Sequence, residues 1–358
     1  MWGNIIISFI LAVLTSFVIT PYTMRLAKKV GALDIPEKRK VHKKPIPRLG
    51  GLAVIAGFLV SVIYLLIILN WEQVDVYDGQ EYIVKLIGFF IGIVLLGITC
   101  FIDDSRGVPA LVKLVVQIIS AIIVCACGIR IENINLPFLS TDLNIAFSYI
   151  LTVGWIVGVT NAINLIDGLD GLSSGISLVS CVSLILIFAI NNSPLLAIIL
   201  ITALAGAILG FLPFNFNPAK TFIGDTGSNF LGFSLAVISI LGVAKTYTAL
   251  VLVAPIIVLG LPIFDTLFAI IRRIIKGKSL KAVLQPDRGH LHHRLMDKGY
   301  TQRQAVMILY GLSATLGLFT IVLLESGIWK ALSFALLVIV LIAVGYKDIC
   351  RLREDKDM

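Results

Sequence analysis

The sequence predicts an all-α integral membrane protein with about eleven transmembrane helices. Of its 358 residues, 58% are hydrophobic and only 14% are charged, which is more apolar surface than a soluble domain of this length needs. Several apolar runs reach the ~20 residues that cross a hydrocarbon core of about 30 Å. We therefore expect one polytopic membrane domain over residues 1–358.

The apolar runs give the expected positions of the spans. The first run has neither a basic n-region nor a small-residue cleavage site, so we interpret it as a retained anchor and not as a signal peptide. The spans are expected near residues 2–22, 50–69, 83–102, 110–127, 145–161, 172–190, 195–213, 229–244, 248–271, 304–324 and 327–346.

Positive charge is concentrated in the loops after the first and ninth spans. The formal net charge of +8 follows the positive-inside rule, which places short Lys- and Arg-rich loops in the cytoplasm. Eight spans separate the two loops, so both can lie on that side. We therefore expect the N-terminus outside, the C-terminus in the cytoplasm, and no nucleic-acid partner.

Acidic motifs collect in the loops assigned to the cytoplasmic side. Carboxylates at bilayer depth are costly and usually face a cavity or a partner, so several on one side indicate one site. Asp265, near the inner end of the ninth span, joins them without a role of its own. The expected active-site loops are residues 23–49, 103–109, 161–171, 214–228 and 272–303.

Asp103 and Asp104 are adjacent at the end of the third span, where we expect both to reach water. Paired carboxylates suit Mg²⁺ binding or proton transfer. The alternative is a solvated helix end with Arg106 as the counter-ion. Lys113, just inside the fourth span, either snorkels to the surface or reaches a phosphate held by the acids.

Asn161, Asn164, Asp167 and Asp170 follow one another at intervals of three residues. On a helix this spacing aligns the four side chains on one face. A glycine follows each aspartate and lets a ligand approach the backbone. The alternative, a polar loop, gives no reason for four amide or acid groups on one stripe.

Residues 222–228 combine an aromatic side chain with an acid between glycines. Phe222 is expected to be exposed and able to stack on a base, although an ordinary interfacial phenylalanine would have the same sequence. The glycines around Asp225 permit close approach of a phosphate or a metal ion.

His290, His292 and His293 lie within four residues, between Arg288 and Arg294. A zinc site would lack a well-spaced fourth ligand. Imidazole and guanidinium groups donate to phosphate oxygens, which favours an anion site over a loop that contacts only lipid headgroups.

A second basic turn contains Lys44 and Arg48 beside two prolines and a glycine pair. It either holds an anionic headgroup near the membrane surface or carries charge that serves topology alone.

Acids for Mg²⁺, basic groups for phosphates and a stacking aromatic together indicate a nucleotide-diphosphate site. Its place at the membrane predicts a lipid co-substrate, and the reaction would be attack of one phosphate on another.

Six motifs occur in one order: HKKPIPRLGG, DD, NAINLIDGLDGL, FIGDTGS, PIFDT and HLHH. In this order they resemble the polyprenyl-phosphate N-acetylhexosamine-1-phosphate transferase family over nearly the whole chain. The resemblance implies transfer of a sugar-1-phosphate from a UDP-sugar to a polyprenyl phosphate, with release of UMP. It implies Mg²⁺, with Mn²⁺ as a substitute, and a bacterial plasma membrane with the active site on the cytoplasmic face.

Three motifs, NAINLIDGLDGL, PRLGG and PIFDT, look most like the UDP-GlcNAc:undecaprenyl-phosphate GlcNAc-1-phosphate transferases. Those enzymes start wall teichoic acid, O-antigen or similar glycans. The muramyl-pentapeptide branch carries three consecutive histidines, whereas Leu291 interrupts the histidines here. The residues after the DD pair, Ser105 and Arg106, are less apolar than is usual in the family.

The resemblance also implies roles for individual residues. Asp225 would bind Mg²⁺, with Asn164 as a second ligand, and Asp103 and Asp104 would lie near the lipid phosphate with Asp103 as the base. Lys113 is grouped with these acids and would bind pyrophosphate. The expected substrate-binding residues, with Asp170 reading uracil and Phe222 stacking on it, are Asn161, Asp167, Asp170, Phe222, Arg288, His290, His292, His293, Lys44 and Arg48.

Other readings remain open at this point. The same chemistry could use another UDP-HexNAc or the UDP-MurNAc-pentapeptide of peptidoglycan synthesis. A secondary transporter would place its polar groups near the midplane, often with inverted repeats, and a non-catalytic scaffold would not need acids, amides and histidines together. The sequence leaves open the sugar, the downstream glycan, a direct or a covalent mechanism, and the oligomeric state, for which a homodimer is one possible assembly.

Overall fold

The chain folds almost entirely into helices, which confirms the predicted all-α class. The computed structural model describes residues 2–36, 44–72, 81–131, 141–243, 249–277 and 289–339. A short apolar helix, Ile328–Ile339, follows the last labelled one. The labelled elements are α1 (Trp2–Val30), β1 (Leu33–Asp34), β2 (Ile46–Pro47), α2 (Gly51–Trp71), α3 (Glu81–Arg106), α4 (Ala110–Ala126), α5 (Thr141–Ile166), α6 (Leu172–Ile190), α7 (Leu195–Asn215), α8 (Gly224–Val243), α9 (Ala249–Val258), α10 (Gly260–Gly277), α11 (Leu291–Asp297) and α12 (Gln302–Ser326).

Within the described residues, eight helices are long and apolar enough to cross a membrane: α1, α2, α3, α5, α6, α7, α8 and α12. Helix α4 and Ile328–Ile339 are apolar but shorter. The expected ninth span is not one helix, because α9 and α10 part at Leu259. Pro262 fits this break, since a proline in a helix's first turn loses no intrahelical bond. The expected last span, 327–346, runs past the described residues.

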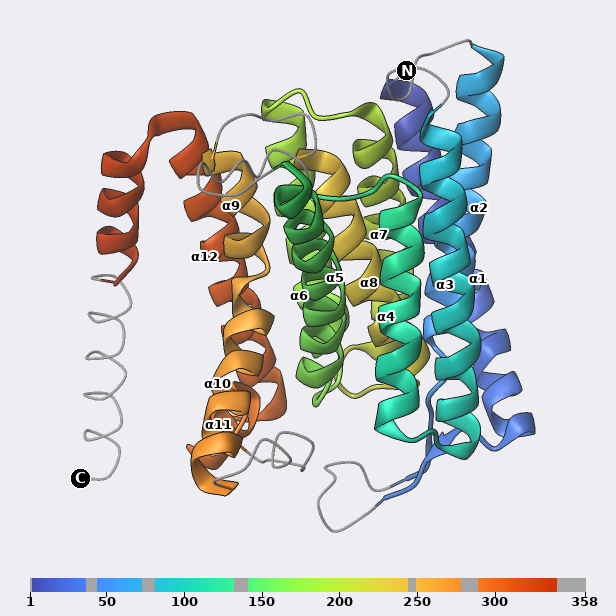
Figure 1. Cartoon of the computed structure of the whole chain (residues 1–358). Helices are drawn as coiled ribbons and strands as arrows, with labels where there is room; N and C mark the ends of the chain where they lie inside the picture. The colour runs from blue at the N-terminus through green and yellow to red at the C-terminus, as the bar shows by residue number, and fades with distance from the viewer. Residues whose placement is uncertain are drawn as a thin grey trace, which may run out of the picture.

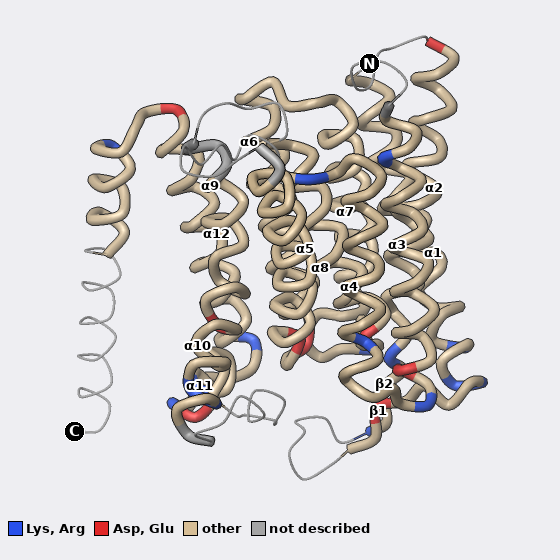
Figure 2. Tube along the Cα trace, in the orientation of Figure 1, with Lys and Arg blue, Asp and Glu red and all other residues tan. Residues whose placement is uncertain are grey.

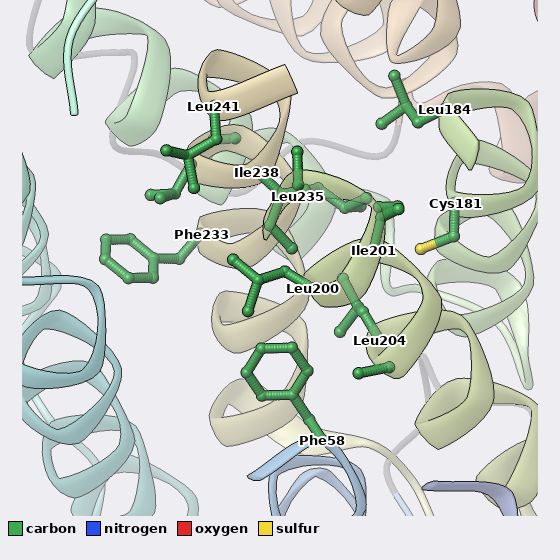
Figure 3. Packing of buried hydrophobic residues seen from close by; sticks show 14 of the residues in the cluster. Phe58, Cys181, Leu184, Leu200, Ile201, Leu204, Phe233, Leu235, Ile238 and Leu241 are labelled. Atoms are coloured by element: carbon green, nitrogen blue, oxygen red, sulfur yellow. The ribbon is translucent and has the colours of Figure 1, made fainter. Parts of the chain in front are cut away.

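Helix α8 forms the centre of the bundle, and every residue of its apolar stretch is buried. It packs against α2, α3, α5, α6 and α7 (Figure 1). Leu235 and Ile238 of α8 point toward Leu200 and Ile201 of α7, with Phe58 of α2 nearby (Figure 3). The backbones come close because small residues face each other; a Cβ on Gly232 would lie 2.7 Å from Thr160 Cα of α5. Such contacts suit association in lipid, where packing drives helix pairing.

Most charged residues lie at one end of the bundle (Figure 2). This end contains the carboxyl-terminal ends of α1, α3 and α5 and the start of α8, whereas α1 begins at the opposite end (Figure 1). The predicted gathering of acids on one side is thereby confirmed.

Candidate active site

The basic turn and the start of α8 are joined through their backbones. Strands β1 and β2 pair antiparallel, with Asp34 opposite Ile46. Beyond this ribbon, Phe222 N–H donates to Pro47 O at 2.7 Å, and Gly50 N–H donates to Phe222 O at 3.0 Å. Arg48 is therefore held next to the residues that begin α8.

Helices α2 and α8 start in direct backbone contact. A Cβ on Gly51 would lie 2.2 Å from Gly227 Cα, and a Cβ on Gly224 would lie 1.9 Å from Arg48 O. Gly224 also has a φ of +69°, a conformation that glycine adopts without strain. The glycines of the RLGG and FIGDTGS motifs thus allow these two motifs to pack together. Gly51 and Gly224 are 173 positions apart in the sequence.

Asp104 caps α8 from the end of α3. Its carboxylate accepts from Asp225 N–H at 2.9 Å and from both the N–H and the hydroxyl of Thr226, at 2.9 and 2.7 Å. Arg48 Nη2 lies 3.2 Å from Asp104 Oδ1, and the Asp104 side chain is 0% exposed. The expectation that Asp104 reaches water was wrong, because its two oxygens satisfy the N–H groups that a helix start leaves unpaired.

Asp103 points to a different partner. Its Oδ1 accepts from Val108 N–H at 2.6 Å, and Lys113 Nζ lies 2.7 Å from its Oδ2. The same Lys113 Nζ is 2.7 Å from Asp225 Oδ2, and Arg48 Nη2 is 3.8 Å from Asp225 Oδ1. Two carboxylates therefore share one ammonium group, with a guanidinium beside them.

We call Asp103, Asp104, Lys113, Asp225 and Arg48 the carboxylate cluster. Its members come from α3, α4, α8 and the turn before α2. Asp225, Lys113 and Arg48 keep 22, 23 and 31% of their side-chain surface exposed, so a ligand can reach them. Burial opposes the charge of Arg48, but the carboxylates of Asp104 and Asp225 outweigh it and raise the pKa of Arg48.

An amide chain connects this cluster to α5. Asn161 Nδ2 donates to Gln117 Oε1 at 2.7 Å, Gln117 Nε2 donates to Asn229 Oδ1 at 2.8 Å, and Asn229 Nδ2 donates to Asp225 O at 2.9 Å. Asn161 is thus part of an interhelical network beneath Asp225. Gln117 and Asn229 were missed from the sequence: Gln117 is a single amide inside an apolar run, and Asn229 directly follows the FIGDTGS motif without being part of it.

Asn164 lies one turn further along α5 and bonds to α8 directly. Its Nδ2 donates to Ser228 Oγ at 2.8 Å, and Ser228 Oγ donates to Gly224 O at 3.0 Å. This bond does not use the carbonyl oxygen of Asn164. The contact places Asn164 beside the first turn of α8, which contains Asp225, and its expected role as a second metal ligand stays a prediction.

Asp167 and Asp170 do not continue the helical face of Asn161 and Asn164. Helix α5 ends at Ile166, and residues 167–171 form a turn that ends in Gly171 at a φ of +75°. The predicted single stripe of four side chains was therefore wrong beyond the helix end. We call residues 167–171 the acid turn.

The two acids of this turn have separate partners. Ser173 Oγ donates to Asp167 Oδ1 at 2.6 Å, and burial raises the pKa of the Asp167 carboxyl to about 7, with the charges of Asp225 and Asp104 adding to the shift. Asp170 Oδ2 accepts from Asn217 Nδ2 at 2.9 Å and from Ala219 N–H at 3.0 Å. Asp170 thereby holds the loop that leads to Phe222, which is half-buried and not fully exposed as expected.

The histidines form a third part of this end of the bundle. Asp265 Oδ2 is 2.8 Å from His290 Nδ1, and Asp265 Oδ1 accepts from Leu291 N–H at 2.8 Å. The His292 ring stacks on His290 with an interplanar angle of 9° and lies against Gly168. We call residues 289–293 the histidine turn.

The histidine turn differs from the predicted cationic loop. Burial and the neighbouring His293 and His290 lower the pKa of His292 to about 3, so this ring is neutral. His293 is half-buried, Lys44 is exposed before β2, and Arg288 lies outside the described residues. Asp265, which had no role in the sequence, is here the residue that anchors the turn.

Comparison with known proteins supports the resemblance drawn from the motifs. The sequence model of glycosyl transferase family 4 matches residues 86–243, from within α3 to the end of α8. A probable undecaprenyl-phosphate N-acetylglucosaminyl 1-phosphate transferase from Bacillus subtilis (strain 168) is 40% identical over 342 residues, 95% of this chain and 91% of that protein.

Two further relatives carry related names. A decaprenyl-phosphate N-acetylglucosaminephosphotransferase from Mycobacterium tuberculosis (strain CDC 1551 / Oshkosh) is 34% identical over 84% of this chain and 77% of its own. A phospho-N-acetylmuramoyl-pentapeptide-transferase from Halalkalibacterium halodurans is 30% identical over 91% of this chain and 97% of its own.

The fold and these matches define a multi-pass membrane enzyme of the transferase class. The chain belongs to glycosyl transferase family 4, in the group of polyprenyl-phosphate sugar-1-phosphate transferases.

Proposed function

We propose that the chain transfers N-acetylglucosamine-1-phosphate from UDP-N-acetylglucosamine to undecaprenyl phosphate and releases UMP. This would be the first membrane step of a cell-envelope glycan such as teichoic acid. The observation that carries the proposal is the carboxylate cluster, in which Lys113 Nζ lies 2.7 Å from both Asp103 and Asp225. The names of the relatives at 40 and 34% identity favour N-acetylglucosamine over the muramoyl-pentapeptide donor.

The reaction joins two anions, so its site must offset their repulsion. In its direct form, an oxygen of the lipid phosphate attacks the β-phosphorus of the UDP-sugar, the bond from that phosphorus to the bridging oxygen breaks, and UMP leaves with that oxygen. Lys113 and Arg48 supply fixed positive charge where charge develops. Asp103 accepts two hydrogen bonds, and its remaining lone pairs can take a proton from the lipid phosphate.

The chemistry of Asp225 and Asn164 fits a bound Mg²⁺. Magnesium in phosphoryl-transfer sites takes one or two carboxylates and completes its shell with water and substrate phosphates. The described residues hold no group of three or more His, Cys, Asp or Glu arranged for a metal, which suits such a shared site better than an all-protein one. When bound, the ion would neutralise the diphosphate, with Asp225 and the carbonyl oxygen of Asn164 as its protein ligands and Mn²⁺ as a substitute.

The nucleotide would bind along the acid turn. Asp170 uses Oδ2 to hold the loop before Phe222, which leaves Oδ1 as an acceptor for the N3–H of uracil. A ring from Phe222 stacking on the base would contribute about 1–3 kcal/mol. Asp167, Asn161 and the histidine turn would border the diphosphate and sugar.

The charged end would face the cytoplasm. Lys28 and Lys29, in the last turn of α1, and Arg48, beside Asp104, lie at that end. Figure 2 shows most of the described Lys and Arg residues there, and the positive-inside rule favours this side. A bacterial plasma membrane, the site of the polyprenyl carrier, would then present the active site to cytoplasmic UDP-sugars. A homodimer is one possible assembly.

The test is UMP release by the purified full-length protein in detergent with Mg²⁺ and undecaprenyl phosphate. A panel of UDP-GlcNAc, UDP-GalNAc and UDP-MurNAc-pentapeptide should give UMP with the first donor at the highest kcat/KM. Release should vanish without the lipid and after chelation of the metal. If no UDP-sugar gives UMP, the transferase proposal fails, and transport of a substrate by reconstituted vesicles would favour the transporter alternative.

Two variants assign the metal site in the same assay. Asp225→Ala should reduce turnover by roughly 100-fold or more, because the carboxylate next to the developing charge is lost. Glu325→Ala, at an exposed position at the end of α12, should retain wild-type turnover. Wild-type turnover by Asp225→Ala would contradict its role as metal ligand.

A further inference from the structure

Asp265 is a buried acid that the proposed reaction does not use. It lies in α10, outside the carboxylate cluster, and is only 4% exposed. Its two oxygens have different partners, His290 Nδ1 at 2.8 Å and Leu291 N–H at 2.8 Å. One carboxylate thus holds both a side chain and the backbone of the histidine turn.

The bond to His290 selects a tautomer. An ionised carboxylate only accepts hydrogen bonds, so His290 Nδ1 must carry the proton. His290 Nε2 is then the ring nitrogen left for a ligand, and the carboxylate fixes the plane of the ring. A carboxylate that orients a histidine in this way acts through that histidine and touches no substrate itself.

A second residue of α10 holds the other side of the turn. Arg272 Nη1 donates to Gly289 O at 2.8 Å, and a Cβ on Gly289 would lie 1.9 Å from Arg272 Cζ. Arg272 therefore binds the chain just before His290, and Asp265 binds it just after. The turn is attached to α10 at both flanks.

The held turn reaches the acid turn through His292. A Cβ on Gly168 would lie 2.3 Å from His292 Nε2, so the ring lies directly on the backbone between Asp167 and Asp170. His292 is 2% exposed, and its Nδ1 has no hydrogen-bond partner within the described part of the chain. Its nearly parallel stack on His290, with centroids 5.8 Å apart, links it to the residue that Asp265 fixes.

We propose that Asp265 is a positioning residue of the transferase: it holds His290 with the proton on Nδ1 and so keeps His292 seated on the acid turn. The inference rests on the proposed function, because the acid turn is the expected nucleotide site. It gives α10 a task in donor binding, although α10 contributes no residue to the carboxylate cluster.

The test combines a spectroscopic and a kinetic readout on Asp265→Asn. The chain contains only 4 histidines, so ¹⁵N-histidine spectra of the full-length protein in detergent at pH 8 are resolvable, with His290→Gln assigning the His290 signals. The wild type should carry the proton on Nδ1. In Asp265→Asn the amide NH₂ donates to Nδ1, and the proton should move to Nε2.

The same variant should lower kcat/KM for UDP-GlcNAc by about 10- to 100-fold, as loss of a residue that orients a functional side chain commonly does. Most of this loss should be a rise in KM, because the acid turn and not the carboxylate cluster is disturbed. Asp265→Glu, which keeps the carboxylate, should restore the Nδ1 proton and part of the activity. Asp297→Asn removes the same charge at an exposed position on α11 and should match the wild type in both readouts.

Each failure has its own signature. An Nε2 proton on wild-type His290 overturns the proposal, whether or not Asp265→Asn folds. Kinetics of a folded Asp265→Asn equal to those of Asp297→Asn overturn it as well. If the wild type releases no UMP from any UDP-sugar, the proposed function fails instead, while the spectra still decide whether Asp265 sets the tautomer.

Discussion

Two buried carboxylates, Asp104 and Asp265, have the same structural task in two regions of the molecule. Asp104, near the end of α3, accepts from two N–H groups that begin α8, and Asp265, in the first half of α10, accepts from the N–H group of Leu291 that begins α11. Both groups are almost fully removed from solvent. An acid in a sequence motif can therefore serve the shape of a site and leave the chemistry to its neighbours.

The two regions differ in what the anchored residues carry. Asp104 fixes Asp225, a carboxylate next to Asp103, and the local charge is balanced by Lys113 and Arg48. Asp265 fixes His290, whose ring can donate or accept. The first region holds cationic side chains between acids, and the second holds a ring in one orientation. A substitution that displaces the anchored residue should therefore have the larger effect in the first region.

Loss of the cap on α8 should have the largest effect. In Asp104→Ala the first turn of α8 loses three hydrogen bonds, at a cost of about 0.5–2 kcal/mol in stability. Because Asp225 begins that turn, we expect UMP release to fall by roughly 100-fold, as small misplacements of reacting groups do. Turnover within threefold of the wild type, with Asp225→Ala inactive, would show that the cap does not place Asp225.

Substitutions at the glycine contacts of the two regions should have the next largest effect. Gly51→Ala places a methyl against the backbone of Gly227, which cannot move aside, so we expect about 1–3 kcal/mol of destabilisation. In Gly168→Ala the atoms nearest the new methyl belong to the side chain of His292 and not to the backbone, so its loss of stability should be smaller. Gly154→Ala, in open space on α5, is the control. The unfolding temperature of each of the three variants is measured in detergent. A larger loss of stability in Gly168→Ala than in Gly51→Ala would contradict this prediction.

The smallest expected effect is a pH dependence from Asp167. Its pKa is about 7 in the folded protein against 3.8 for the free side chain, so the native state binds the extra proton between these values. The wild-type free energy of unfolding should fall as pH rises from about 4 to 7 and then level off. Asp167→Asn lacks this titration, and its unfolding temperature relative to the wild type should increase from pH 5 to pH 8. If the difference in unfolding temperature between Asp167→Asn and the wild type is the same at pH 5 and pH 8, the Asp167 carboxyl is not desolvated.

Much of the site could be predicted from the sequence. The apolar runs required a membrane bundle, and Asp103, Lys113, Asp225 and Arg48 were among the charged residues marked as a site. In the structure Lys113 lies 2.7 Å from Asp103 and from Asp225, and Arg48 lies 3.8 Å from Asp225. These predictions succeeded because a charge inside an apolar run has few tolerable places. The order of the motifs added the family resemblance, and the comparisons confirm the family.

The errors had a common physical cause. Spacing by three predicted one helical face for Asp167 and Asp170, but the helix ends at Ile166 and the acids lie in a turn. Adjacent position predicted one environment for Asp103 and Asp104, yet successive helical residues point about 100° apart, and only Asp104 meets α8. Gln117 and Asn229 were missed because each amide joins the site only through its partner on another helix.

By itself, the sequence determined the class of fold, the end of the bundle that carries charge, and the acidic motifs that gather there, because these depend on composition and local pattern. The tertiary structure alone decided which acid faces a ligand and which one caps a helix. That choice depends on hydrogen bonds between segments more than 20 residues apart, such as Asp104 to Asp225 and Asp265 to His290. The N–H groups and rings that bond to each carboxylate belong to other helices and turns, whose positions the local sequence does not determine.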